Sequence, residues 1–283
     1  MKMVAASKLR RAQESIFNSR PYAYKIREMV EQLRGKIDPA ESGIPPAREQ
    51  IRRALVVVVT ADRGLAGAFN SNVIKTAEQL ISAEFATLKA TGDLDLVCVG
   101  RKGHEYFGKR GYSLVGDYRG LFSDLKFEGA SEIVGILIDG YVSEKWDKVV
   151  VVYNEFRNTI AQNRIVEPFL PVPDFFQTPV MEESEDYRSP DPNGNDLDYI
   201  FEPGAAKMAW PLLIQYLDFQ MWRILLESNA SEQGARMVAM DNATTNAGEL
   251  LKELQLRYNQ ARQAAITKEI LEISSGAEAL AKG

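Results

Sequence analysis

The turn DRGLAG at residues 62–67 has the residue types that could bind a phosphate group. It follows an apolar run at 54–60 and precedes a helical pattern that begins near residue 70. In that setting, the amides of a glycine-rich turn and the amino end of a helix can hold the phosphates of a nucleotide. The turn lacks both the G-x-G-x-x-G spacing and the lysine of G-x-x-x-x-G-K-[ST]. The simpler interpretation is that its glycines permit a tight turn.

Side chains that could catalyse a reaction or bind a metal are scarce. His104 is the only histidine and Cys98 the only cysteine. A zinc site takes several such ligands, and a Ser–His–Asp arrangement needs a histidine held by neighbours, whereas His104 lies in a polar turn. A single cysteine cannot form an internal disulfide, which favours a reducing compartment. We therefore expect no catalytic residue, no metal and no cofactor in this chain.

The composition is typical of a water-soluble globular protein. The chain has 283 residues, 45% of them hydrophobic and 26% charged, and a net charge of −5. It contains no run of about 18 apolar residues that could span a membrane, and its basic start lacks the apolar core of a signal peptide. The acidic balance argues against general affinity for nucleic acid.

Charge is unevenly distributed along the chain. Lysine and arginine are concentrated in residues 1–36, and aspartate and glutamate in residues 181–202. The basic stretch can be a solvated helix face or a contact surface for acidic loops of a partner. The acidic stretch also contains Pro190, Pro192 and Gly194, so we expect a mobile surface loop there.

The middle of the chain alternates between two kinds of pattern. Short apolar runs predict buried strands at 54–60, 94–100, 148–154 and 164–170. Helical patterns lie between them, at about 70–89, 102–110 and 132–142. Strands that alternate with helices predict a Rossmann-like α/β domain with a mostly parallel sheet. The domain boundaries that we expect are 1–49 for an N-terminal helix and linker, 50–175 for the α/β domain, 176–204 for the acidic loop and 205–283 for a long C-terminal helix.

Both ends of the chain carry apolar or small residues at alternating steps of three and four, which marks one side of a helix as a seam for another helix. Pro21 lies within the first helix, where we expect a bend rather than a stop. Seams at opposite ends of one chain can pair as a coiled coil. The N-terminal seam comprises Ala5, Leu9, Ala12, Ile16, Ser19, Ala23, Ile26, Val30, Leu33 and Ile37. The C-terminal seam comprises Met237, Met240, Thr244, Ala247, Leu251, Leu254, Tyr258, Ala261 and Ala265.

The C-terminal helix is too long to stay within a small domain. From residue 205 to residue 280 it would extend roughly 110 Å at 1.5 Å per residue. Its end carries a second apolar line and would have no partner in the chain, so another protein must cover it. This apolar tip comprises Ile266, Ile270, Ile273, Ala277 and Leu280.

Several segments together resemble the gamma subunit of F-type ATP synthase. Three of them are short: MKMVAASKLRRAQ at the start, SRPYAY and DRGLAGAFN. The most specific is the continuous segment at residues 231–280, which begins SEQGARMVAMDNATTNAGELL and continues directly with KELQLRYNQARQAAITKEILEISSGAEAL. The resemblance implies a central rotor stalk, in which the two end helices form a long antiparallel coiled coil inside a ring of alternating alpha and beta subunits. The α/β domain would then lie below, against the epsilon subunit and the c-subunit ring, and nucleotide would bind to the alpha and beta subunits.

The resemblance also implies roles for individual residues. Arg262 and Gln263 match the pair that meets a beta-subunit loop, and the tip from Ile266 to Leu280 matches the part that turns inside an apolar collar. We further expect Lys268 and the basic residues Lys8, Arg10 and Arg11 to contact acidic beta-subunit loops. A foot region at the base of the long helix, formed by Tyr199, Phe201 and Glu202, is expected to contact the epsilon subunit or the c ring.

The chain departs from the family at its start, since members carry roughly twenty more residues before MKMVAASK. It also lacks the paired cysteines of the light-regulated chloroplast type. The expected location is the cytoplasmic side of a bacterial inner membrane, with membrane contact only through the c ring. Two other classes stay open: a Rossmann-like protein that binds a small molecule, and a coiled-coil scaffold such as a rod associated with nucleic acid.

Overall fold

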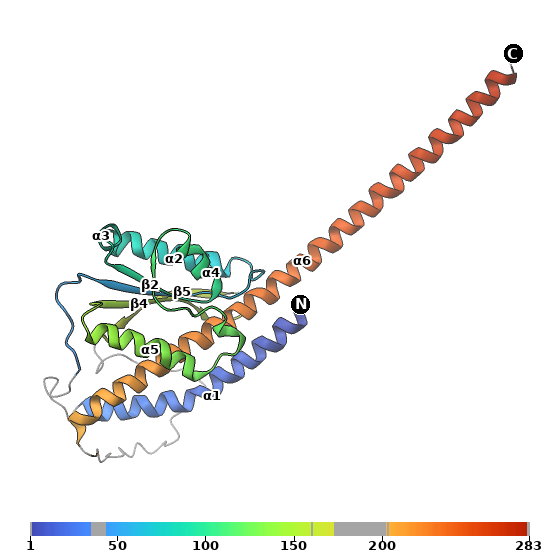
Figure 1. Ribbon diagram of the computed structural model, residues 1–283. Coiled ribbons are helices and arrows are strands. Elements are labelled where there is room, and N and C mark those ends of the chain that lie inside the picture. The colour runs from blue at the N-terminus through green and yellow to red at the C-terminus, as the bar shows by residue number, and fades with distance from the viewer. Residues whose placement is uncertain (1, 35–43, 160, 173–201, 203, 282–283) are drawn as a thin grey trace.

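A computed structural model describes residues 2–34, 44–159, 161–172, 202 and 204–281. An α/β body holds one end of a long helix, and the other end of that helix projects far beyond it (Figure 1). The long helix, α6, spans Ala205–Ala281, and its 77 residues extend about 115 Å. The chain thus forms a compact body and a rod.

The first helix, α1 (Lys2–Arg34), lies along the lower part of α6 and runs antiparallel to it (Figure 1). At one end, Lys2 Nζ lies 2.6 Å from the Asp241 carboxylate. At the other end, the rings of Tyr22 and Phe219 lie 5.6 Å apart. The expected contact between the N- and C-terminal helices is therefore confirmed, and α1 continues past Pro21.

The pairing covers less of α6 than the two seams predict. Among the seam residues of α1 whose side chains the structure describes, most are buried, including Ala5, Leu9 and Ala12. Along α6, by contrast, every residue from 241 to 277 is exposed. In the described residues, the predicted pairing does not extend over the seam from Thr244 to Ala265. Lys2 lies beside Asp241, and the rest of α1 runs from there toward the base of α6.

The body contains a five-stranded sheet in the order β3-β2-β1-β4-β5. The strands are β1 (Ala54–Val59), β2 (Leu94–Val99), β3 (Ser113–Leu114), β4 (Lys148–Phe156) and β5 (Gln162–Leu170). The strands from β3 to β4 are parallel, and β5 is antiparallel to β4. Parallel strands need a crossover of a dozen or more residues, and the short link from β4 to β5 permits only a hairpin. The mostly parallel sheet is confirmed, although the sequence patterns gave no signal for β3.

Helices cover both faces of the sheet. One face carries α2 (Phe69–Glu84), α3 (Ala86–Thr91) and α4 (Arg101–Gly108), and the other carries α5 (Phe127–Val142), α6 and α1 (Figure 1). The single helix predicted at 70–89 is interrupted at Phe85, whose ring is buried in the core. α5 begins five residues earlier than the pattern at 132–142 predicts, and the short 3₁₀ helix η2 (Leu121–Ser123) precedes it.

The central strand β1 is buried on both faces, as its continuous apolar run predicts. Leu55, Val57 and Val59 pack toward α5 and α6. Ala54, Val56 and Val58 pack toward α2 and α4. The lower part of α6 is therefore a component of the body's own core, and the rod is continuous with it.

Replacing Gly140 by alanine should destabilise this core. A Cβ atom at Gly140 would lie 2.0 Å from Cζ3 of Trp146, an indole that is 1% exposed. Overpacking of this kind costs about 1–3 kcal/mol, so the midpoint of urea unfolding should fall. Gly135 lies on the same helix with nothing within 4 Å of such a Cβ. Gly135→Ala is the control and should be stabilising by about 0.5–1 kcal/mol; equal midpoints for the two variants would contradict the packing described.

Candidate functional site

The described residues contain no group of three or more His, Cys, Asp or Glu side chains that could hold a metal ion. Cys98 is buried in β2, and burial raises the pKa of its thiol to about 12. A thiol that keeps its proton at neutral pH is a poor nucleophile. His104 is half-buried on α4. Neither side chain belongs to a catalytic arrangement.

The turn at 62–67 lies at the carboxyl end of β1, where doubly wound α/β domains generally bind ligands. Oδ1 of Asp62 accepts hydrogen bonds from the backbone N–H groups of Arg101 and Gly120, at 3.0 and 2.7 Å. Leu65 adopts a φ of 63°, in the left-handed region that a leucine rarely occupies, and its side chain is exposed. The turn is thus tied to the next two loops and presents an apolar side chain to solvent.

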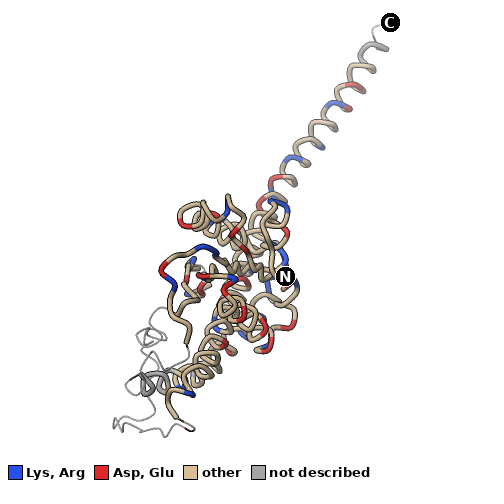
Figure 2. The backbone as a smooth tube through the Cα atoms, turned by 60° about the vertical axis from the view of Figure 1, so that its left-hand side comes forward, with Lys and Arg blue, Asp and Glu red and all other residues tan. Residues whose placement is uncertain are grey.

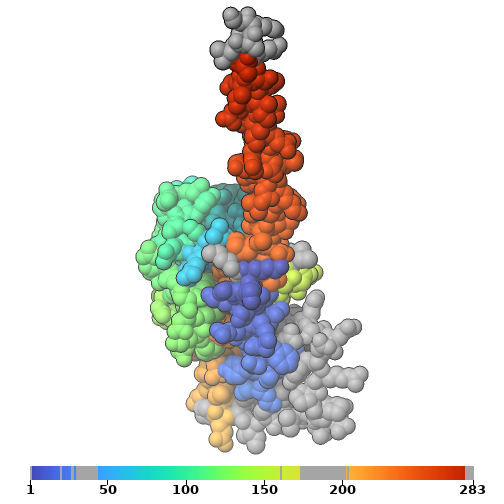
Figure 3. All heavy atoms as spheres, turned by 90° about the vertical axis from the view of Figure 1, so that its right-hand side faces the viewer, coloured from blue at the N-terminus to red at the C-terminus, as the bar shows by residue number. Residues whose placement is uncertain are grey.

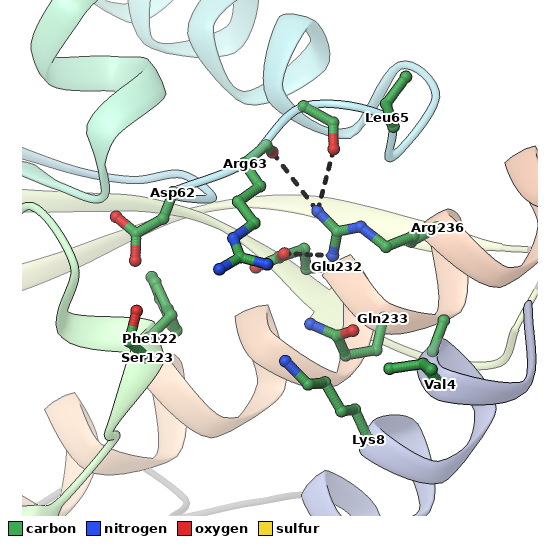
Figure 4. Close-up of a pocket in the computed structure, with 12 residues that line it drawn as sticks. Val4, Lys8, Asp62, Arg63, Leu65, Phe122, Ser123, Glu232, Gln233 and Arg236 are labelled. Atoms are coloured by element: carbon green, nitrogen blue, oxygen red, sulfur yellow. Dashed lines mark hydrogen bonds and ion pairs between the residues drawn. The ribbon is translucent and has the colours of Figure 1, made fainter. Parts of the chain in front are cut away.

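A side chain of the long helix closes over this turn. Nη2 of Arg236 donates to the carbonyl oxygens of Gly64 and Arg63, at 3.1 and 3.4 Å (Figure 4). Its other nitrogen pairs with Glu232, which is only 5% exposed. Burial raises the pKa of Glu232 above its usual value, and Arg236 opposes that shift. The position at which a nucleotide would bind in other α/β domains is here a joint between the body and the rod.

A groove of about 460 Å³ remains between this turn, α1 and α6. The side chains of Lys8, Arg63 and Gln233 point into it (Figure 4). Lys8 is one of the basic residues predicted to contact a partner. Among the residues that line the groove, the cations Lys8, Arg63 and Arg236 outnumber the carboxylates Asp62 and Glu232, which favours an acidic group there.

The predicted contact residues of the rod all lie in its exposed part. Arg262 and Gln263 are exposed on α6, and the Nζ of Lys268 lies 3.7 Å from Glu272 in an exposed i,i+4 pair. Ile266, Ile270 and Ile273 of the predicted tip are 45, 60 and 70% exposed. Leu280 belongs to α6. Charged residues of both signs are spaced along this part of the helix (Figure 2).

The basic residues of α1 lie far from Arg262 along the axis of α6. Lys8 shares the groove with residues 233 and 236 of α6, which are about 40 Å along the helix from Arg262. Arg10 pairs with Glu14 at 2.9 Å, and Arg11 is exposed. The structure therefore does not bring the two groups of predicted contact residues together. One loop of a partner cannot contact both groups.

The predicted foot is only partly described. Glu202 is exposed a few residues before α6 begins. Tyr199 and Phe201 lie outside the described residues. The foot contact therefore stays a prediction.

One polar cluster was missed by the sequence analysis. Arg223 lies on α6 with a side chain only 14% exposed, and it binds Glu167 of β5 with two hydrogen bonds of 2.9 Å. The sequence does contain a signal for this cluster. Arg223 lies within the apolar stretch MWRILL, and a charged side chain that is buried with such neighbours needs a partner of opposite charge. A single sequence does not show which carboxylate supplies it.

Comparisons with known proteins agree with this architecture. A family model described as ATP synthase matches residues 1–280. The ATP synthase gamma chain of Salinibacter ruber is 56% identical over 281 residues, which cover 99% of this chain and 91% of that protein. The chain belongs to the ATP synthase gamma chain family. Another member, from Chloroherpeton thalassium, is 46% identical over 284 residues, covering 99% of this chain and 91% of its own.

Chains from two solved structures share the fold. A chain from the central stalk and c ring of the Tetrahymena thermophila mitochondrial ATP synthase is similar with a TM-score of 0.57 and 23% identity, covering 86% of this chain and 97% of that chain. A chain from the Euglena gracilis mitochondrial enzyme gives 0.56 and 17%, covering 99% and 94%. At these identities, the similarity concerns the fold alone.

Replacing Arg236 by methionine should destabilise the chain by about 3 kcal/mol, because it leaves the buried Glu232 without its ion pair. Since Arg236 holds the Glu232 pKa down, the loss should shrink at acidic pH, where that carboxyl takes up a proton. Arg257→Met is the matched control: it breaks an i,i+4 pair with Glu253 on the same helix, but one that is 69 and 54% exposed. Its cost should be about 0.5 kcal/mol. Urea unfolding at two pH values measures both, and a similar loss in the two variants would show that Arg236 has no special role.

Proposed function

We propose that this chain is the central rotor stalk of an F-type ATP synthase. It would couple rotation of the c ring to conformational cycling of the catalytic beta subunits, and it would contain no catalytic site itself. Family membership supports this assignment over a scaffold or a small-molecule-binding protein. In this proposal, residues 50–175 would belong to the α/β domain and residues 205–283 to the shaft helix, whose lower part packs into the core of that domain.

The exposed part of α6 is the observation that carries the proposal. Residues 241–277 stand clear of the body for about 50 Å (Figure 3). Large apolar side chains at more than half exposure are costly in water and indicate burial by a partner. An annular sleeve of alpha and beta subunits would cover such a rod on all sides. The apolar residues concerned are Leu250, Leu251, Leu254, Leu256, Tyr258, Ile270, Leu271 and Ile273.

Asymmetric contacts would let the rod act on one beta subunit at a time. A ligand shifts a conformational equilibrium only by its differential affinity for the two states. Moving a site from mostly open to mostly closed takes roughly 5.5 kcal/mol, which two or three charge-assisted hydrogen bonds of about 1.5–3 kcal/mol could supply. In this proposal, Arg262, Gln263 and Lys268 would make these bonds. The isoleucines of the tip would act as a bearing, because apolar contacts are non-directional.

The basic residues of α1 would form a second, lower tier of contacts. Lys8 is directed into the groove at the joint, and Arg10 and Arg11 lie on the same helix. With about 40 Å between the tiers, we propose that the lower tier meets acidic loops at the mouth of the sleeve. The upper tier would meet different loops deeper inside.

The foot would face the membrane sector. Glu202 lies at the base of α6, at the opposite end of the helix from the tip. We propose that it contacts the epsilon subunit or the c ring together with Tyr199 and Phe201, on the cytoplasmic side of a bacterial inner membrane. None of the helices in the described part of the chain combines the length and apolar character that a membrane crossing requires. Cross-links from Glu202 only to alpha or beta subunits would contradict the foot contact.

Co-expression tests the assignment as a whole. The chain should join the alpha and beta subunits of its source organism in a stoichiometric assembly of three alpha, three beta and one copy of this chain. Native mass spectrometry gives the stoichiometry. A chain that stays outside the assembly, or one that binds a dinucleotide tightly by itself, would refute the proposal.

The double substitution Arg262→Ala and Gln263→Ala tests the upper tier. Loss of one or two charge-assisted hydrogen bonds of about 1.5–3 kcal/mol should slow ATP hydrolysis and coupled proton pumping by roughly tenfold or more. Lys252→Ala removes an exposed cation from the same part of the helix and serves as the control. Both rates are measured in the assembled complex. Wild-type rates in the double variant would rule out the role proposed for Arg262 and Gln263.

A further inference from the structure

The cluster around Arg223 joins three elements through hydrogen bonds. Arg223 of α6 binds both carboxylate oxygens of Glu167 on β5 at 2.9 Å. Its Nη1 also donates to the hydroxyl of Tyr153 on β4, at 3.1 Å. That hydroxyl in turn donates to Oε2 of Glu167, at 2.9 Å. A closed triangle of polar groups therefore connects the shaft helix to the two last strands of the sheet.

Around this triangle, much of the contact of α6 with the body is apolar, and Asp218 of α6 accepts a side-chain hydrogen bond from Ser131 of α5. Leu213, Leu217 and Ile224 of α6 belong to the same core cluster as the side chains of β1 and β4. Apolar packing resists separation of two elements, but it is non-directional and fixes the rotation of a helix about its own axis less sharply than hydrogen bonds do. Hydrogen bonds require defined distances and angles, and here Nη2 of Arg223 donates to both oxygens of Glu167 while Nη1 donates to the hydroxyl of Tyr153. The triangle is therefore suited to set the angle of α6 about its axis.

Stability alone gives a weak reason for such a cluster. Burying an arginine and its carboxylates removes their hydration, and well-packed apolar residues in the same volume often give equal or greater stability. The alternative use of a buried ion pair is to select one arrangement among several of similar energy. In a round helix held by apolar contacts, the competing arrangements differ in rotation about the helix axis.

We propose that the Glu167–Arg223 pair is the rotational lock that makes the body and the shaft turn as one. This inference rests on the rotor function proposed above. The exposed part of α6 begins at residue 241, about 27 Å along the helix from Arg223. Torque applied to that part therefore acts at least this far from the Glu167–Arg223 pair. A slip of one residue would turn α6 by about 100° and would redirect every contact side chain of the shaft. The lock prevents that slip at the point where α6 lies against the sheet.

Glu227 provides an internal control for this inference. It also pairs with Arg223, at 3.3 Å, and its side chain is 10% exposed. It lies on α6 itself, four residues from Arg223, so this pair does not cross from the shaft to the body. Burial raises the pKa of Glu227, with Arg223 opposing, and Oε2 of Glu227 has no hydrogen-bond partner among the described residues. Its neutral analogue, glutamine, should therefore be well tolerated.

The experiment compares Glu167→Gln with Glu227→Gln in the assembled complex reconstituted in liposomes. Each variant removes one carboxylate charge beside Arg223, but only Glu167→Gln weakens the connection between α6 and the sheet. The measured quantity is the number of protons pumped per ATP hydrolysed. We expect this ratio to fall by roughly threefold or more in Glu167→Gln and to stay at the wild-type value in Glu227→Gln. Equal ratios in the two variants would overturn the inference.

A removable cross-link separates rotational locking from general stability. A Cβ atom at Gly234 of α6 would lie 3.5 Å from the Cα of Thr159, in the link between β4 and β5. Cysteines at these two positions, added to the Glu167→Gln variant, can form a disulfide between the shaft and the body. Oxidation should restore the ratio of protons to ATP, and reduction should lower it again. A ratio that does not respond to oxidation, with the disulfide verified by mass spectrometry, would show that slip between α6 and the sheet is not the defect.

Arg223→Met extends the test by removing the cation from all of its partners. It should lower the ratio of protons to ATP at least as far as Glu167→Gln, and the same disulfide should restore it. A wild-type ratio in assembled Arg223→Met would also overturn the inference. The wild-type complex reports on the rotor function separately: if it fails to assemble or pump, the proposed function fails, whereas normal pumping in every variant refutes only the lock.

Discussion

The burial of the lower part of α6 in the core of the body is the interaction on which the rest of the structure depends. Leu213, Leu217 and Ile224 are almost fully buried there, and at about 1.5–3 kcal/mol for each such side chain they anchor the helix firmly. The remaining length of α6 can stand free in solvent only because this end is held. α1 adds a second helix along the same section, so the anchored part is enclosed by the sheet, α5 and α1.

Two arginines of α6 complete the connection with directional contacts. Arg223 reaches the last strands of the sheet, and Arg236 reaches the turn after β1 about 20 Å farther along the helix. Both pair with a buried glutamate on α6 itself, and both also contact a group of the body. Apolar packing thus supplies most of the adhesion, while these polar contacts define how the helix is set on the body.

Much of the fold followed from the sequence because its signals are local. The apolar runs predicted β1, β2, β4 and β5, and the apolar and small residues at steps of three and four predicted the long C-terminal helix. The direction of β5, the two-residue strand β3 and the partner of Arg223 depend on contacts between distant segments, which a periodic pattern does not encode. The extent of the pairing along α6 has the same limit: periodicity shows that one side of a helix is apolar, but not which chain covers it.

The position of Cys98 has a practical consequence. It is the only cysteine of the chain, and it lies 2% exposed in the middle of the sheet. Maleimide reagents that modify surface thiols should therefore pass over it, because a protonated and enclosed sulfur reacts slowly. If a new cysteine is introduced on the rod, a dye or bead should attach at that new position only. The chain without the new cysteine should stay unlabelled and can serve as the control.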